Sequence, residues 1–128
     1  MCGNMDRPSK DEYFFKIAED VALRATCLHR KVGAVIVRDG FILSTGYNGA
    51  PKNEVHCIDI ECSKPIKGQN QERCRAVHAE ANAIINAALC GVSIREATIY
   101  CTLEPCTICM AMIKNAELEV KFKEKYYE

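Results

Sequence analysis

The sequence has no long apolar run and no leader-like start. No window reaches the roughly 18 uninterrupted apolar residues that a membrane-spanning helix needs. Residues 1–6, MCGNMD, show no basic start followed by an apolar stretch, so the pattern of a secretory signal is missing. We therefore expect a cytoplasmic protein without a membrane partner.

The chain also lacks a net charge, because 17 lysines and arginines balance 17 acidic residues. Binding to long nucleic acids draws mainly on the neutralisation of phosphates, so this balance argues against a nucleic-acid partner. Repeats, low-complexity runs and linkers rich in Gly, Pro and Ser are missing too, and the 128 residues match the size of one domain. We expect residues 1–128 to form a single domain.

Cysteine, by contrast, is abundant, with nine residues. Disulfides are rare in the reducing compartment that we expect for this chain. Metal ligation or catalysis is then the better explanation for the excess of cysteine. We therefore expect at least one metal site.

The apolar pattern predicts alternating helices and strands. Ser9 and Glu12 have the spacing of a capping box and mark a helix start. Asp39-Gly40 has the composition of a two-residue hairpin turn between two β-prone runs. The predicted elements are helices at 9–28, 77–89 and 105–115 and strands at 33–38, 41–45, 97–101 and 117–122.

This order of elements predicts an α/β fold. The first two strands pair antiparallel, and helices connect the later strands, so we expect a mixed sheet with helices covering its faces. Residues 46–76 form a long polar stretch with little apolar pattern. Structureless loops of that length are uncommon in compact domains and are usually functional.

Two short motifs at predicted helix starts carry the chemistry: residues 78–80, HAE, and residues 105–109, PCTIC. Cys106 and Cys109 are three residues apart, so both thiols project from one helix face. The helix N-terminus favours the thiolate form that a metal binds. Together with His78 they supply three zinc ligands and leave a fourth position for water, as in a catalytic site.

Glu80 lies two residues from His78 and can shuttle the proton of a water that zinc activates. Residues two apart in a regular helix point in nearly opposite directions, so both can serve one metal only where the site caps the helix end. A lone Cys-x-x-Cys pair is also typical of redox sites and of half a structural zinc site. Both motifs together match the signature of zinc deaminases, whose glutamate is the general acid and base.

From about Tyr13 to Lys121 the chain resembles the cytidine and deoxycytidylate deaminase superfamily, and within it the deoxycytidylate (dCMP) deaminases. The narrower resemblance rests on residues 26–27 (TC), 30–36 (RKVGAVI), 46–51 (GYNGAP), 74–75 (CR) and 78–84 (HAEANAI). The Gly-Tyr-Asn-Gly-x-Pro loop is its strongest marker. The resemblance implies a three-layer α/β/α fold with a mixed sheet.

The resemblance also implies a function, which is the hydrolytic deamination of dCMP to dUMP and ammonia in pyrimidine deoxynucleotide metabolism. A homo-oligomer, often a hexamer, is implied as well, with dCTP as activator and dTTP as inhibitor. The roles that it assigns are zinc ligation for His78, Cys106 and Cys109, proton transfer for Glu80, contact with the substrate sugar for Asn48, and a backbone contact with the pyrimidine carbonyl for Ala79.

Two other functions stay open. Residues 102–106, TLEPC, also resemble guanine, tRNA-adenosine and riboflavin-pathway deaminases, so the substrate could be cytidine, guanine or adenosine in tRNA. The other alternative is a non-catalytic protein that binds zinc or nucleotides through a deaminase fold. Its mark would be the loss of Glu80, which is present here.

The remaining cysteines suggest a second, structural zinc. Some viral dCMP deaminases hold one at the positions of Cys27 and Cys57, and Cys62 and Cys74 would complete a closed tetrahedral set. Unlinked thiols in a loop are the alternative, and His56 is a possible substitute ligand. Two further cysteines in apolar settings, Cys90 and Cys101, are predicted to be core residues.

The sequence departs from the family at two places. Some members carry an arginine on the His-x-Glu helix where Leu89 stands here, so the substrate phosphate needs other donors. Candidate donors are Arg24, Arg30, Lys31, Arg73 and Arg75. Members usually continue with another helix and often a fifth strand after the fourth strand, and they have Ala-Gly-Ile where residues 116–118 read AEL. We expect a shortened sheet edge.

Overall fold

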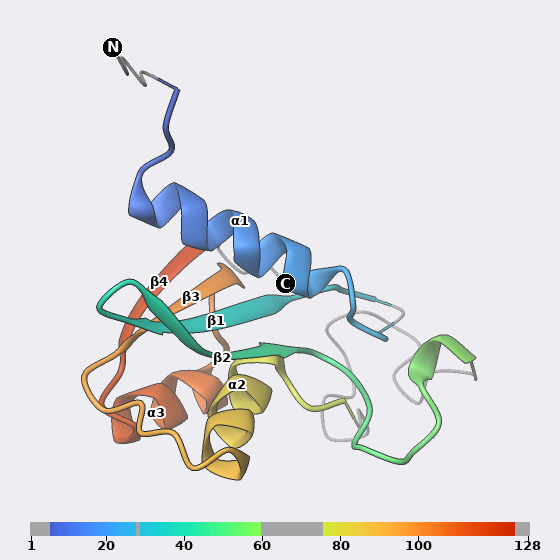
Figure 1. Ribbon diagram of the computed structural model, residues 1–128. Coiled ribbons are helices and arrows are strands. Elements are labelled where there is room, and N and C mark those ends of the chain that lie inside the picture. Colours follow the sequence, from blue (N-terminus) through green and yellow to red (C-terminus); the bar gives the residue numbers. More distant parts are fainter. Residues whose placement is uncertain (1–5, 28, 60–75, 125–128) are drawn as a thin grey trace.

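The computed structural model describes residues 6–27, 29–59 and 76–124. These residues form a sheet with helices on both faces (Figure 1). Helix α1 (Lys10–Ala22) covers one face, and α2 (Ala79–Leu89) and α3 (Thr107–Asn115) cover the other. The predicted three-layer α/β/α architecture is confirmed. No helix in the described part of the chain is long and apolar enough to cross a membrane.

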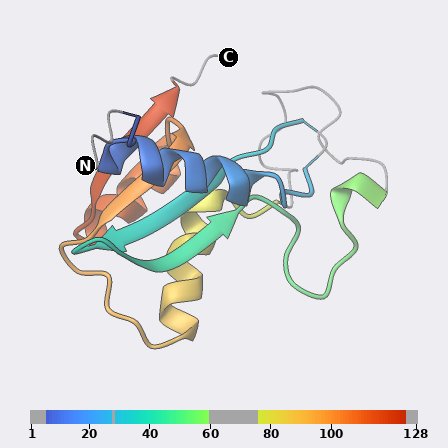
Figure 2. The ribbon, with the colours of Figure 1, turned by 45° about the horizontal axis from the view of Figure 1, so that its top comes forward.

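The sheet is mixed, as predicted. Its strands are β1 (Gly33–Arg38), β2 (Phe41–Tyr47), β3 (Thr98–Leu103) and β4 (Glu119–Glu124), in the order β2-β1-β3-β4. Strand β1 is antiparallel to β2 and β3, and β3 is parallel to β4. The segment after β2 leaves the sheet at the end opposite the β1–β2 turn (Figure 2) and contains a short 3-10 turn, η1 (Cys57–Asp59).

The β1–β2 turn has the predicted form. Asp39 and Gly40 both have positive φ, 54° and 81°, as a type I′ hairpin turn requires. Successive side chains of a strand point to opposite faces of the sheet. Ala34 and Ile36 therefore pack in the core on the side of α2 and α3, and Val35 packs in the core under α1. Each face of the sheet therefore has its own helix layer.

Two expectations from the sequence are wrong. The first helix ends at Ala22 instead of residue 28, because the chain turns so that the backbone N–H of Thr26 donates to the carbonyl of Asn48 (3.2 Å). Cys90 is exposed, since it is the C-cap of α2 and lies beyond the core. Cys101 is fully buried, as predicted. The other helices and strands lie where the pattern predicts them, with ends that differ by at most two residues.

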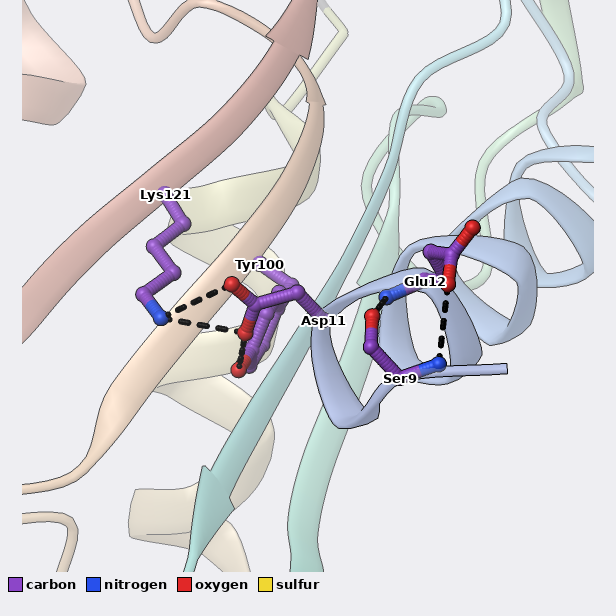
Figure 3. Close-up of polar contacts among 5 residues, drawn as sticks. All are labelled: Ser9, Asp11, Glu12, Tyr100 and Lys121. Atoms are coloured by element: carbon purple, nitrogen blue, oxygen red, sulfur yellow. Dashed lines mark hydrogen bonds and ion pairs between the residues drawn. The ribbon is translucent and has the colours of Figure 1, made fainter. Parts of the chain in front are cut away.

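A polar cluster fastens α1 to the sheet (Figure 3). One carboxylate oxygen of Asp11 accepts hydrogen bonds from the Tyr100 hydroxyl (2.7 Å) and the Lys121 ammonium (3.0 Å). These bonds hold the pKa of the Asp11 carboxyl below its usual value, while burial and the Asp11 charge raise the pKa of Tyr100 to about 12.

The predicted capping box is present at the start of α1. The N–H of Glu12 donates to the hydroxyl of Ser9, and the N–H of Ser9 donates to the carboxylate of Glu12.

The AEL segment at 116–118 forms the end of α3. Glu117 has φ 61°, the left-handed conformation that favours glycine, which is the residue that family members usually have here. Its N–H donates to the carbonyl of Lys114 (3.0 Å), and the N–H of Leu118 donates to that of Ile113 (3.1 Å). This pattern is a Schellman motif, made here at the cost of a strained glutamate. Among the described residues no element follows β4.

Two glycines let the helices approach the sheet closely. A Cβ atom at Gly33 would lie 2.1 Å from the carbonyl oxygen of Ala18 in α1. A Cβ atom at Gly46 would lie 2.3 Å from the nitrogen of Ala83 and 2.4 Å from the carbonyl oxygen of Ala79, both in α2. Both distances are far below van der Waals contact, so neither position accepts a side chain without backbone movement.

We predict that Gly46→Ala destabilises the protein by about 1–3 kcal/mol, the usual cost of overpacking, because the new methyl group pushes α2 away from β2. Chemical denaturation measures this cost. Thr45→Ala, an exposed neighbour on the same strand, is the control and should change the free energy of unfolding by less than about 0.5 kcal/mol. Equal stability of the Gly46→Ala and control proteins would contradict the close contact.

Candidate metal centre

His78 stands at the point where an extended segment becomes a helix. The preceding residue, Val77, exchanges two backbone hydrogen bonds with Gly49 (2.7 and 3.1 Å). His78 itself is extended (φ −70°, ψ 155°) and is the N-cap of α2, with Glu80 in the first turn. Because His78 lies outside the helix, its side chain need not point away from that of Glu80, as it would in a regular helix. This is the arrangement that allows His78 and Glu80 to serve one site.

Cys106 and Cys109 approach the same place from α3. Cys106 is the N-cap of this helix, and its sulfur accepts a hydrogen bond from the backbone N–H of Cys109 (3.5 Å). The Nδ1 atom of His78 lies 3.5 Å from Sγ of Cys106 and 3.4 Å from Sγ of Cys109. Within the described ranges this is the one group of potential ligands close enough to hold a metal ion.

The geometry of these three residues fits zinc. With ordinary Zn–N and Zn–S bond lengths, neighbouring N and S ligands of a tetrahedral zinc lie about 3.6 Å apart. The two N···S distances of 3.5 and 3.4 Å match this value. A set of one imidazole and two thiolates is typical of zinc, and it leaves one position of the tetrahedron open.

The charges around the site favour the binding of a cation. Burial, the nearby Glu80 carboxylate and Cys106 raise the pKa of the Cys109 thiol when no metal is bound. The N–H of Ala81 donates to Cys109, and the N-termini of α2 and α3 both favour thiolate. A dication would overcome the remaining penalty and hold both sulfurs as thiolates.

Glu80 is a buried carboxyl group beside these ligands. Its exposed fraction is 4%, and burial raises its pKa above the usual value. Burial and then the Glu80 charge raise the pKa of both the Cys101 and the Cys109 thiols. A buried carboxyl group next to a metal site is well suited to exchange protons.

The two predicted substrate contacts lie in different settings. Ala79 is fully buried at the start of α2. Asn48 follows β2 and is 7% exposed; its Oδ1 accepts from the N–H of Val32 (2.8 Å), and its Nδ2 donates to the carbonyl of Arg30 (3.0 Å). Within the described part of the chain, one amide hydrogen and one lone pair of Asn48 are left for a further partner.

The other predicted residues are only partly described. Cys27 is a half-buried free thiol, and Cys57 begins η1. Cys62 and Cys74 lie outside the described residues, so the structure does not show whether the second cysteine cluster comes together. Among the candidate phosphate donors Arg24 and Lys31 are exposed, Arg30 is half-buried, and Arg73 and Arg75 lie outside the described residues.

Sequence reasoning missed Asn82. Its side-chain amide donates to the carbonyls of Tyr47 (2.8 Å) and Val77 (3.4 Å), the second of which directly precedes His78. The sequence carries a signal for it. Asn82 and Asn86 are polar residues at helical spacing in a helix otherwise made of Ala, Ile, Leu and Glu, where apolar packing alone does not require them.

Comparison with known proteins agrees with this site. A family model for the cytidine and deoxycytidylate deaminase zinc-binding region matches residues 8–122. The deoxycytidylate deaminase of Mycobacterium phage D29 is 40% identical over 124 residues, covering 90% of this chain and 94% of the phage enzyme. The deoxycytidylate deaminase of Saccharomyces cerevisiae is 38% identical over 123 residues, covering 94% of this chain but only 39% of the yeast enzyme.

A solved structure shows the same fold. It is the dCMP deaminase of the cyanophage S-TIM5 in complex with dCMP and dUMP, which superimposes with a TM-score of 0.80 at 31% identity. The match covers 94% of this chain and 85% of that one. The family model matches most of this chain, and the three residues that could hold a metal ion lie together. The chain therefore belongs to the cytidine and deoxycytidylate deaminase family.

Proposed function

We propose that this protein deaminates dCMP hydrolytically, so that dCMP and water give dUMP and ammonia. The observation that carries the proposal is the meeting of His78, Cys106 and Cys109 beside the buried carboxyl group of Glu80. The narrower choice of dCMP is supported by the phage relative, which has nearly the same length and the name deoxycytidylate deaminase. It is also supported by the cyanophage enzyme, whose structure contains dCMP and dUMP.

Zinc, when bound, lowers the pKa of a water in its open position towards neutrality and so supplies hydroxide. Glu80 is the group that moves protons. Its carboxylate accepts a proton from the attacking water and delivers it to N3 of the ring as hydroxide adds to C4. Glu80 then takes the proton of the new C4 hydroxyl group and delivers it to the amino group. The C4 carbonyl forms as the C4–N bond breaks, and ammonia leaves. The burial of Glu80 keeps bulk water from competing for these protons.

The rest of the substrate is held by groups around α2 and the end of β2. Asn48 contacts the deoxyribose, and the backbone at Ala79 faces the pyrimidine carbonyl. The segment that Asn48 fastens, at residues 30–32, carries Arg30 and Lys31. Arg30, Lys31 and Arg24 are the described candidates for binding the substrate phosphate. One of them would replace the arginine that some family members have at the position of Leu89.

We also propose a second, structural zinc at Cys27, Cys57, Cys62 and Cys74. Its support in the described residues is local to Cys27, whose sulfur accepts a hydrogen bond from the N–H of His29 (3.4 Å). Two buried polar atoms in the same segment, Oγ1 of Thr26 and Nε2 of His29, have no hydrogen-bond partner among the residues that the structure describes. A zinc ion bound to Cys27 would fix the position of this segment.

The cellular setting follows from the family resemblance. We propose a cytoplasmic homo-oligomer, a hexamer by that resemblance, that dCTP activates and dTTP inhibits. The exposure of large apolar side chains on α2 and α3 supports an assembly, because such residues are usually covered in the working protein. They are Ile85, Leu89 and Ile108.

We predict that Glu80→Gln keeps zinc but lowers kcat by about 10²–10⁴-fold, because glutamine cannot exchange the proton. Metal analysis and steady-state kinetics with dCMP measure both quantities. Glu119→Gln, an exposed site on β4, is the control and should behave like the wild type. Retained activity in Glu80→Gln would contradict the assigned role.

We predict that ammonia is released from dCMP but not from deoxycytidine, dCTP or guanine. Release from guanine would favour the alternative that the TLEPC segment at 102–106 keeps open. If none of the four compounds reacts while zinc is bound, the proposal is wrong, and adenosine in tRNA or a non-catalytic role becomes the better explanation. A coupled assay for ammonia makes these comparisons directly.

We predict two zinc ions per chain in the purified protein and one in the Cys27→Ser variant, which should keep its activity. Elemental analysis against protein concentration gives the count. Cys90→Ser removes an exposed thiol and is the control, with two zinc ions expected. A wild-type chain with a single zinc would reject the second site but leave the catalytic one untouched.

A further inference from the structure

Asn82 contacts the backbone on both sides of the metal ligand His78. Its Nδ2 donates to the carbonyl of Val77 (3.4 Å), which belongs to the peptide group before His78. Its backbone N–H donates to the carbonyl of His78 itself (2.9 Å). The same Nδ2 makes its shortest bond to the carbonyl of Tyr47 at the end of β2 (2.8 Å). One residue thus joins the edge strand, the extended segment and the start of the helix.

His78 needs such support because it cannot stabilise itself as an N-cap. A usual N-cap side chain accepts hydrogen bonds from the first turn and so fixes its own backbone. His78 makes no such bond, and its Nδ1 faces the two cysteine sulfurs instead. The peptide groups that flank His78 then contribute to the direction of its imidazole.

We infer that Asn82 is a positioning residue for the metal site, whose side chain helps to aim the His78 imidazole at Cys106 and Cys109 by fixing the peptide group before His78. The inference rests on the proposed zinc site. Groups that orient metal ligands without touching the metal affect metal affinity by about 10–100-fold in other sites. Asn82 acts on the backbone of the ligand, so we expect an effect at the lower end of this range.

The chain provides a matched control one turn further along α2. Asn86 also donates its Nδ2 to a carbonyl of β2, that of Thr45, at 2.9 Å. Ser44 adds a reverse bond from its hydroxyl to the carbonyl of Ala83 (2.6 Å). Neither of these bonds involves Val77 or His78. Asn82 and Asn86 therefore both join α2 to β2 by a side-chain hydrogen bond. Of the two, only Asn82 also bonds to the peptide group next to His78.

The test compares Asn82→Ala with Asn86→Ala in the full chain. Competition with a chromophoric chelator, with both variants made in Cys27→Ser so that only the site at His78 is measured, gives the zinc affinity of each variant. Thermal unfolding of the metal-free proteins gives the structural cost. We expect Asn82→Ala to weaken zinc binding about tenfold. We expect Asn86→Ala to stay within about twofold of the wild type, while both metal-free proteins lose similar stability because each lacks one hydrogen bond between α2 and β2.

Replacement of zinc by Co²⁺ gives a second measurement, because the visible bands of the cobalt protein report the ligand geometry. Asn82→Ala should change these bands and Asn86→Ala should not. Asn82→Ser, a smaller polar side chain, is the second variant, with the same expectation for affinity. Equal zinc affinity and identical bands in the Asn82 and Asn86 variants would overturn the inference. So would unfolding of both Asn82 variants beside a folded Asn86→Ala.

The failure of this inference differs from the failure of the proposed function. A wild-type chain that binds no zinc, or a chain whose zinc content does not fall after His78→Ala, would contradict the proposed function. Zinc binding that depends on His78 but is insensitive to Asn82 would leave the proposed function intact and reject only the positioning role.

Discussion

The packing of α2 on the edge strand β2 is the contact on which the candidate site depends. The absence of a side chain at Gly46 lets the helix backbone approach the strand, and Ser44 and Asn82 add hydrogen bonds across the contact. This contact fixes where the helix begins. Because His78 is the residue before that beginning, the position of this proposed metal ligand follows from the packing of the helix.

The second half of the site depends on the sheet in another way. Strand β3 lies in the middle of the sheet, and its end delivers the chain to the start of α3 on the same face as α2. A bond from the N–H of Gly33 to the hydroxyl of Thr102 (3.1 Å) holds the last part of β3 against the start of β1. Cys106 is thus presented from a rigid strand, and each helix contributes its positive end to one cluster of sulfur ligands.

Much of this could be predicted from the sequence because it depends on local patterns. Apolar alternation predicts the strands, the spacing of Ser9 and Glu12 predicts a helix start, and two motifs at helix starts predict the metal ligands. What could not be predicted depends on distant partners. The end of α1 is set by a bond to Asn48, and the role of Asn82 by carbonyls that only the folded chain brings near it.

The three donors of the metal site are far apart along the chain, since His78 is separated from Cys106 and Cys109 by 28 and 31 positions, with β3 between them. An ion held by all three acts as a cross-link that closes a loop of the chain, and this loop contains the central strand β3. Closing the loop lowers the conformational entropy of the unfolded chain. The native state then gains stability with every increase in free zinc. For the zinc site that we propose, a fall in free zinc would therefore destabilise the fold as well as empty the site.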